Sequence, residues 1–256
     1  MKILAIGDIV GTIGCKFLRE KLPALKKTEG IDLVIANGEN SADGNGITPS
    51  SAHYIFSSGV DIITGGNHSF RRKECYPFYD ESPFLLRPAN FPEGSTPGKG
   101  FAVYDFGRLQ VGVINLMGCM YMESLDDPFR TADRLIGELG TRITVVDFHA
   151  EATAEKLALA YYLAGRVSAV FGTHTHVQTA DETILEKGTG YITDVGMTGP
   201  ISSVLGVRPE LAIRKFRDKL PVRFDLADGK CKLDCIIFEI DEKTGSTISI
   251  KRIELH

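Results

Sequence analysis

The 256-residue sequence lacks the features that mark several common classes of protein. No apolar run reaches 18 residues, so no transmembrane helix is expected. The apolar stretch in "MKILAIGDIVG" is too short for a signal peptide and is interrupted by Asp8. The net charge of −4 argues against a general nucleic-acid coat, which would need a basic face. These absences favour a globular protein that does not cross a membrane.

Cysteine is also scarce. The five cysteines are odd in number and have no paired spacing, which does not fit a disulfide framework. They are typical of reduced thiols, and we therefore expect a cytoplasmic protein. Cys231 and Cys235 are four residues apart, but no second Cys or His pair accompanies them, so we do not expect a zinc site there.

The first two-thirds of the chain alternates short apolar runs with amphipathic segments. This alternation predicts a largely parallel sheet covered by helices on both faces. In the helix expected at 48–59, Thr48 is the expected N-cap, Pro49 lies in the first turn and Gly59 ends the helix. In the helix expected at 17–27, Pro23 is expected to kink or restart the helix. The expected strands are 2–7, 31–38, 60–66, 101–106, 109–117, 142–148 and 167–172, and the expected helices are 17–27, 48–59, 131–140 and 151–165.

The pattern changes after Gly190. A helix is expected at 208–216, followed by antiparallel strands at 221–229, 231–241 and 246–255 that are separated by "DG" and "KTG" turns. We expect these strands to form a second sheet packed on the first, in an α/β sandwich. No linker calls for a second domain, so residues 1–256 are expected to form one domain.

Polar residues follow five of the apolar strands at the point where each strand ends. In an open α/β sheet the carboxyl ends of the parallel strands form the ligand crevice, so we expect these side chains to meet. His53, inside a predicted helix, and His256, at the chain end, lie away from every strand end and are expected to be structural. The residues expected at one site are Asp8, Glu39, Asn40, Asn67, His68, His149, His174 and His176.

The donors in this set are imidazole, carboxylate and amide groups, without a thiolate. They suit iron or manganese, and also zinc, cobalt, nickel or magnesium. One tetrahedral ion needs only four ligands, whereas two divalent ions that share a carboxylate use the larger set, and Glu39 is the best bridge. Two ions about 3.5–4 Å apart can activate water and clamp a phosphate, so the sequence predicts phosphoester cleavage.

Several strings of the sequence carry a resemblance to a known family. They are "IGDIVG", "NGEN", "GGNH", "DFHAEATAEKLAL", "GTHTHVQTAD" and "YITDVGMTGP", with "RPANFPEG" at 87–94. Over residues 1–254 the chain resembles the YmdB-type family of calcineurin-like metallophosphoesterases. The resemblance implies a phosphodiesterase that hydrolyses 2′,3′-cyclic nucleotides, with RNA ends as further candidate substrates and a homo-oligomer as a candidate assembly.

The resemblance also implies a role for each site residue. A metal-bound hydroxide would attack phosphorus, and His68 would stay off the metals and protonate the leaving oxygen. Asp147 and Asp194 are candidate partners of the ligand histidines, or caps and turn residues only. One metal would be held by Asp8, Glu39, Asn40 and His176, and the other by Glu39, Asn67, His149 and His174.

Two segments depart from the family pattern. The run "SFRRKECY" follows "GGNH" where a more acidic stretch is expected, and "NLMGCMYMESLDDPF" (115–129) is less polar than usual. Both are candidates to line the substrate side. Arg71 and Arg72 either help to hold a phosphate or belong to a solvated face.

Two alternative functions stay open at this point. A broad-specificity phosphatase would use the same metals, and a non-enzymatic regulator would bind a cyclic nucleotide or RNA in the same crevice. A nucleotide-cofactor oxidoreductase is not favoured, because "GDIVGTIG" (7–14) is not GxGxxG and Asp8 occupies the place that a pyrophosphate would need.

Overall fold

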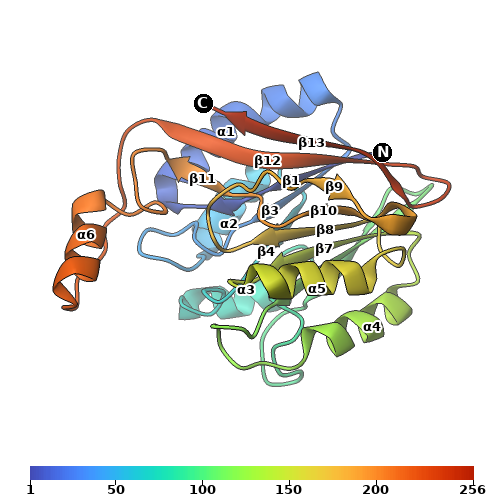
Figure 1. Ribbon diagram of the computed structural model, residues 1–256, viewed down its shortest axis with the longest axis horizontal. Helices are drawn as coiled ribbons and strands as arrows, with labels where there is room; N and C mark the ends of the chain where they lie inside the picture. The colour runs from blue at the N-terminus through green and yellow to red at the C-terminus, as the bar shows by residue number, and fades with distance from the viewer.

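The computed structural model describes residues 1–256 and contains two stacked β-sheets between layers of helices (Figure 1). The first sheet has the strand order β2-β11-β12-β1-β3-β4, and β13 pairs with β12. Within it, β1, β3 and β4 are parallel to one another, whereas β12 is antiparallel to β1. Its strands are β1 (Lys2–Ile6), β2 (Asp8–Ile9), β3 (Leu33–Asn37), β4 (Ile62–Thr64), β11 (Met197–Pro200), β12 (Cys231–Ile240) and β13 (Thr247–Leu255).

The second sheet has the order β5-β6-β7-β8-β10-β9. Strands β6, β7, β8 and β10 are parallel, and β5 pairs with β6 in the expected hairpin. Its strands are β5 (Phe101–Asp105), β6 (Gln110–Met117), β7 (Ile143–His149), β8 (Ala169–Thr173), β9 (Thr183–Ile184) and β10 (Gly190–Ile192).

Strand alternation divides the apolar side chains between three layers of core. In β1, Ile3 and Ala5 pack between the two sheets, whereas Leu4 and Ile6 pack against helices on the outer face. Figure 1 shows α1 above the sheets, α4 and α5 below them, and α6 projecting to one side. The helices are α1 (Gly11–Glu29), α2 (Pro49–Ser57), α3 (Tyr76–Glu81), α4 (Pro128–Leu139), α5 (Thr153–Leu163) and α6 (Pro209–Asp218), with short 3₁₀ turns η1 (Lys73–Cys75) and η2 (Glu186–Gly188).

The predicted class, an α/β sandwich of two sheets, is confirmed, but the distribution of strands is not the expected one. The parallel strands are split between both sheets, and β12 and β13 extend the first sheet beside β1. The run "CIIF" explains the placement of β12, because Ile236 faces the second sheet while Cys235 and Ile237 face the outer helices. A strand that is apolar on both sides belongs inside a covered sheet.

Two local predictions are also corrected. Helix α1 begins at Gly11 rather than at residue 17 and continues through Pro23. Its first turn lies so close to β11 that a Cβ at Gly14 would be 2.4 Å from the Thr198 carbonyl oxygen. The predicted strand 221–229 is wrong, because only Leu226 makes a bridge there, to Val207. The capping box at Thr48 is present as expected.

None of the helices has the length and apolar character needed to cross a bilayer. All five cysteines are free thiols. The prediction of a single domain over residues 1–256 stays a prediction.

Candidate metal centre

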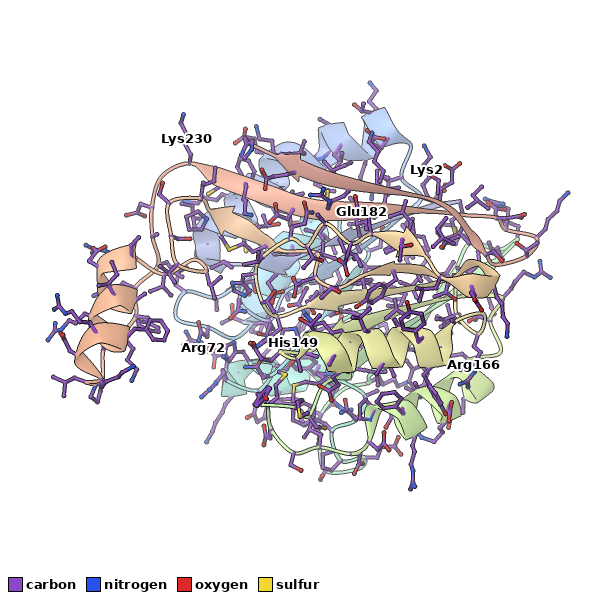
Figure 2. The ribbon with its side chains drawn as sticks, viewed as in Figure 1. Lys2, Arg72, His149, Arg166, Glu182 and Lys230 are labelled. Atoms are coloured by element: carbon purple, nitrogen blue, oxygen red, sulfur yellow. The ribbon has the colours of Figure 1, made fainter.

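The carboxyl ends of β1, β3 and β4 in one sheet meet the carboxyl ends of β7 and β8 in the other. The predicted site residues occupy these ends, so the two sheets share the site instead of one sheet carrying it. Each of the eight residues lies within 3.5 Å of at least one other member, through the contacts given below. His149 lies within the molecule, as Figure 2 shows.

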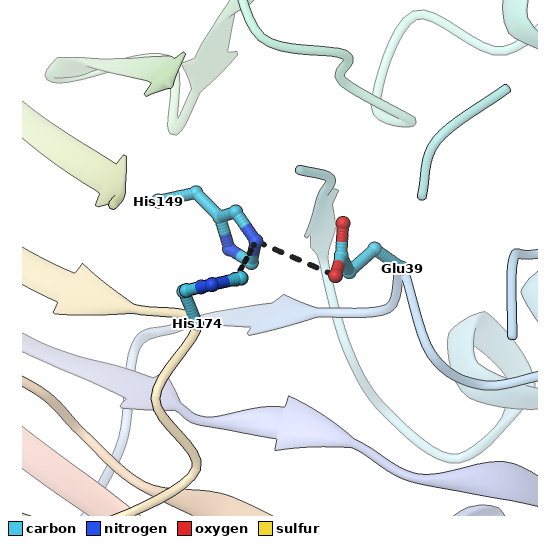
Figure 3. Close-up of side chains that lie close together, drawn as sticks. All are labelled: Glu39, His149 and His174. Carbon is cyan, nitrogen blue, oxygen red and sulfur yellow. Dashed lines mark hydrogen bonds and ion pairs between the residues drawn. The ribbon is translucent and has the colours of Figure 1, made fainter. Parts of the chain in front are cut away.

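Glu39, His149 and His174 form the tightest part of the cluster (Figure 3). Their ligand atoms all lie within 4.8 Å of one another. His149 Nε2 is 3.4 Å from Glu39 Oε1 and 3.1 Å from His174 Nδ1. Asn67 Oδ1 approaches the same His149 nitrogen at 2.9 Å. Four donor groups from four strand ends therefore face one small volume.

Asp8, Asn40 and His176 form the second half of the cluster. His176 Nε2 is 3.5 Å from Asp8 Oδ1 and 3.3 Å from Asn40 Nδ2. Asn40 Nδ2 is in turn 3.0 Å from Glu39 Oε1. The Glu39 carboxylate thus touches members of both halves, which is the position that a bridging ligand requires.

His68 lies beside both halves. Its main-chain N–H donates to Glu39 Oε2 at 2.7 Å, and its ring Nδ1 is 2.9 Å from Asn40 Oδ1. An amide oxygen only accepts hydrogen bonds, so the Nδ1 of His68 carries the proton in this arrangement. The ring is part of the cavity wall.

Two features of the cluster fit a pair of cations. Asp8 is completely buried, and its Oδ1 makes no hydrogen bond, with His176 Nε2 3.5 Å away. A buried carboxylate oxygen without a hydrogen bond is costly, and a cation would satisfy it. A Cβ at Gly66 would lie 2.3 Å from the His149 ring and 2.4 Å from Glu39 Oε2, so this glycine keeps the donor atoms accessible to one another.

The cavity above the cluster has a volume of about 540 Å³. Its wall contains three carboxylates, Glu39, Glu151 and Asp225, and neither lysine nor arginine. These carboxylates disfavour phosphate, and no lysine or arginine of the wall offsets them. The protein side chains alone therefore do not make this cavity suitable for an anion, whereas bound divalent cations would reverse its charge.

The charges of the cluster shift the pKa values of its members. Burial opposes ionisation of Glu39, but the charge and hydrogen bonds of His149 and the hydrogen bond of His68 hold the pKa of this carboxyl well below its usual range. Burial lowers the pKa of His149, but the nearby Glu39 carboxylate outweighs it and raises this pKa to about 9. The cation-free cluster therefore favours a carboxylate at Glu39 and an imidazolium at His149 near neutral pH.

A chain of buried hydrogen bonds orients His149 from behind. Thr173 Oγ1 donates to Asp147 Oδ1 at 2.8 Å and is 2.9 Å from His149 Nδ1, and the hydroxyl of Thr64 also donates to Asp147. Because the Thr173 proton points to Asp147, Thr173 accepts from His149 Nδ1–H, which aims Nε2 at the cluster. Burial raises the pKa of Asp147 to about 7. Asp147 therefore acts on the histidine through Thr173, where the sequence left open a partner of a ligand histidine or a cap.

Asp194 positions the loop that carries the other two histidines. Its Oδ2 accepts from the Thr175 N–H at 3.0 Å and from Lys156 Nζ at 2.7 Å, and Lys156 and Asp194 are both completely buried. Thr175 separates His174 (φ 103°) and His176 (φ 64°), two left-handed residues that need external support. Lys156 was not among the predicted residues. The signal was present, because Lys156 shares the buried face of α5 with Leu159, Ala160 and Leu163.

The remaining candidates lie outside the cavity. Arg72 donates to the carbonyl groups of Asp43 and Asn45 and so holds the 43–45 loop, where the sequence left a phosphate contact open. Arg72 lies toward the edge of the molecule in Figure 2. Neither 69–76 nor 115–129 lines the cavity. His53 packs on Phe78, with the ring centres 4.7 Å apart, and His256 pairs with Glu254, as expected of residues away from the site.

Fold and site together define a metallophosphoesterase-like protein. The family model of the YmdB-like proteins matches residues 4–253. A 2′,3′-cyclic-nucleotide 2′-phosphodiesterase of Bacillus subtilis (strain 168) is 51% identical over 255 residues, which cover 99% of this chain and 96% of that protein. This chain belongs to the YmdB-like family, and the resemblance noted in the sequence is confirmed.

Solved structures agree with this assignment. A phosphatase from Mycoplasma pneumoniae superposes with a TM-score of 0.95 at 34% identity, covering 100% of this chain and 93% of that chain. A 5′-nucleotidase from Staphylococcus aureus matches with a TM-score of 0.61 at 14% identity, over 100% of this chain and 54% of that chain. The second likeness concerns the fold alone.

Proposed function

We propose that the protein is a metal-dependent phosphodiesterase that opens 2′,3′-cyclic nucleotides to nucleoside monophosphates. The observation that carries the proposal is the convergence of eight nitrogen and oxygen donors under a cavity without lysine or arginine, where the buried Asp8 Oδ1 makes no hydrogen bond. The 51% identity to a 2′,3′-cyclic-nucleotide 2′-phosphodiesterase supports the same substrate class. A site that attracts phosphate only when cations are bound fits an enzyme that depends on them.

The two halves of the cluster suggest how two divalent cations would be held. Side-chain atoms of Asn67, Glu39 and His174 all approach His149 Nε2. Side-chain atoms of Asn40 and Asp8 both approach His176 Nε2. Nitrogen and oxygen donors without thiolate favour iron or manganese. We assign Asp8, Glu39, Asn40 and His176 to one cation, and Glu39, Asn67, His149 and His174 to the other.

To ligate a cation, the side-chain amide of Asn40 would have to turn. Its Nδ2 faces Glu39 and His176, whereas its Oδ1 faces His68. An N–H group does not ligate a cation, so ligation needs a half-turn of the amide. After that turn the His68 Nδ1–H would keep Glu39 Oε1, 3.1 Å away, as its acceptor, and an imidazolium at His68 would carry on Nε2 the proton that it gives away.

Bound divalent cations supply a nucleophile from water at neutral pH and neutralise the negative charge of the phosphate. The chain supplies the other parts of the reaction. Glu39 orients His68 through the main-chain N–H at 2.7 Å and through the ring Nδ1 at 3.1 Å. His68 gives its proton to the ribose oxygen that leaves phosphorus, a step that contributes about 10²–10⁴-fold in rate.

The reaction balances as a hydrolysis. One water oxygen bonds to phosphorus after its proton leaves to solvent, the bond from phosphorus to O2′ breaks, and O2′ takes the proton from His68. His68 then regains a proton from solvent. The product is a nucleoside 3′-monophosphate. Breakage of the bond to O3′ would give the 2′-monophosphate, so the identity of the product shows which oxygen faces His68.

The test is an assay of purified protein on 2′,3′-cAMP with added Mn²⁺ or Fe²⁺, with products separated by chromatography. The proposal expects formation of one AMP isomer that stops on chelation. Binding of the cyclic nucleotide without any product would favour the non-enzymatic regulator. Faster turnover of nucleoside monophosphates or p-nitrophenyl phosphate would favour a broad-specificity phosphatase, which the M. pneumoniae relative makes the second candidate. RNA ends as substrates and a homo-oligomeric assembly stay predictions.

A further inference from the structure

The site cavity has two chemically different ends. Donor groups occupy one end, and four apolar side chains occupy another part of the same wall. The apolar group consists of Leu205, Val207, Phe224 and Leu226 and is called the apolar wall below. A nucleotide has the same division, because its phosphate is charged while its base is a flat, weakly polar ring.

The apolar wall is held in place by main-chain contacts. Val207 and Leu226 form a β-bridge, Arg208 N–H donates to the Asp225 carbonyl at 3.1 Å, and Ala227 N–H donates to the Gly206 carbonyl at 2.9 Å. Leu226 also closes over the start of α1, since a Cβ at Gly11 would lie 2.1 Å from its Cδ1. Two chain segments that carry no regular strand are therefore joined into one surface.

The apolar wall is also tied directly to the cluster. His176 Nδ1 lies 3.0 Å from the Leu205 carbonyl oxygen, and a carbonyl only accepts, so the histidine donates. Leu205 adopts a left-handed backbone conformation, with φ at 55°, which is unfavourable for a leucine. This conformation presents the carbonyl to His176 while the leucine side chain remains 47% exposed on the cavity wall.

Phe224 is the exposed aromatic residue of the apolar wall. Its side chain is 45% exposed and belongs to none of the three core clusters. It lines the site cavity and also a neighbouring cavity of about 600 Å³. A half-exposed aromatic ring on the wall of a nucleotide-sized cavity, outside the core clusters, provides a surface on which another ring can stack.

We propose that the apolar wall is the nucleobase subsite, in which the base of the substrate stacks on Phe224 beside Leu205, Val207 and Leu226 while its cyclic phosphate faces the donor cluster. This proposal rests on the proposed function and adds the part of the site that recognises the nucleoside. Stacking on an aromatic ring accepts every base, because every base has a π-face. The subsite therefore discriminates nucleotides from phosphodiesters without a base, and discriminates little between bases.

The test compares two substrates in three proteins. The substrates are 2′,3′-cAMP and methyl riboside 2′,3′-cyclic phosphate, which has the same cyclic ester but no base. The proteins are the wild type, Phe224→Ala and the control Phe216→Ala, which removes an exposed ring of α6 that does not line the cavity. Phe224→Tyr is the conservative variant.

We expect Phe224→Ala to raise KM for 2′,3′-cAMP about 5- to 150-fold, the range for loss of one stacked base, with kcat within about twofold. The KM of Phe224→Ala for the base-free substrate should equal that of the wild type. Phe216→Ala and Phe224→Tyr should both keep the wild-type KM for 2′,3′-cAMP. An unchanged KM for 2′,3′-cAMP, or an equal loss on both substrates, overturns the subsite.

The same variants separate this proposal from the proposed function. If the wild type turns over neither substrate, the hydrolytic function fails, and calorimetric titration with 2′,3′-cAMP then tests the subsite by itself. Weaker binding by Phe224→Ala than by Phe216→Ala supports the subsite in that case. Equal affinity of the two variants, or no binding by the wild type, overturns it.

Discussion

The donor end of the site and the apolar wall are built in opposite ways. Asp8, Glu39 and His149 are fully or almost fully buried and sit on the ends of strands in two packed sheets. Leu205 and Phe224 are exposed and sit in irregular segments before and after α6. Chemistry that needs fixed donor geometry is placed on the rigid core, whereas recognition of the variable part of a substrate is placed on loops.

The first and largest prediction removes the shared carboxylate at the donor end. Glu39→Gln keeps the shape of the side chain but removes the charge that both halves of the cluster use. Loss of a residue that only supports a metal ligand lowers metal affinity by up to about 100-fold. We expect Glu39→Gln to lower metal affinity further than that, and turnover to fall to background. Elemental analysis and a 2′,3′-cAMP assay measure both. Retention of two tightly bound cations would show that Glu39 is not the bridge.

The second prediction separates proton transfer from metal binding. His68→Gln should lower kcat about 10²–10⁴-fold, because the donor to the leaving oxygen is lost, while metal content is unchanged. The matched control is His53→Gln in α2, which removes a histidine that packs on Phe78 away from the site. Wild-type kcat in the His68 variant would remove this residue from the mechanism.

The third prediction concerns the support beneath the histidine loop. Lys156→Met leaves the buried Asp194 carboxylate without its cationic partner, at a cost of about 3–5 kcal/mol in the free energy of unfolding. The Thr175 loop should loosen, and metal affinity should fall about 10–100-fold. Denaturant unfolding and metal titration check the two effects, with the exposed Lys27→Met as control.

A double variant keeps this third prediction testable if Lys156→Met does not fold. Combining Lys156→Met with Asp194→Asn removes the unpaired charge but leaves an amide that can accept from Thr175 N–H. We expect stability to recover while metal affinity stays below that of the wild type. Wild-type metal affinity in a folded Lys156→Met protein would reduce the ion pair to a purely structural role.

The same contrast between the two ends of the site explains how much of it could be predicted from the sequence. His149 and His174 were found because apolar strands end directly before them, and parallel strands point their carboxyl ends the same way. This prediction assumes one sheet, and it holds for two because the carboxyl ends of β1, β3 and β4 meet those of β7 and β8.

The apolar wall had no such pattern to reveal it. The segment 221–229 alternates apolar and polar residues and was predicted as a strand, but it makes only the Val207–Leu226 bridge. Its path is set by distant contacts, above all Leu226 over Gly11. Lys156 and Thr173 were missed because their partners come from other elements, although the buried position of a lysine on α5 was readable from its spacing.

The fourth prediction uses the raised pKa of His149, about 9 in the cation-free protein. A cation binds the neutral imidazole, so below pH 9 binding must displace one proton. Metal affinity should therefore rise about tenfold per pH unit from pH 7 to 9 and level off above it. Titrations with chelator-buffered Mn²⁺ measure this slope. Affinity that is independent of pH over this range would contradict the account of the Glu39–His149 pair.

The most direct test of the central claim is a titration of the metal-depleted protein with Mn²⁺ or Fe²⁺ under anaerobic conditions, followed by the rate of 2′,3′-cAMP hydrolysis. The account predicts no turnover without cation and a rate that saturates at two equivalents per chain. Full turnover in the depleted protein, or saturation at a single equivalent, would contradict it.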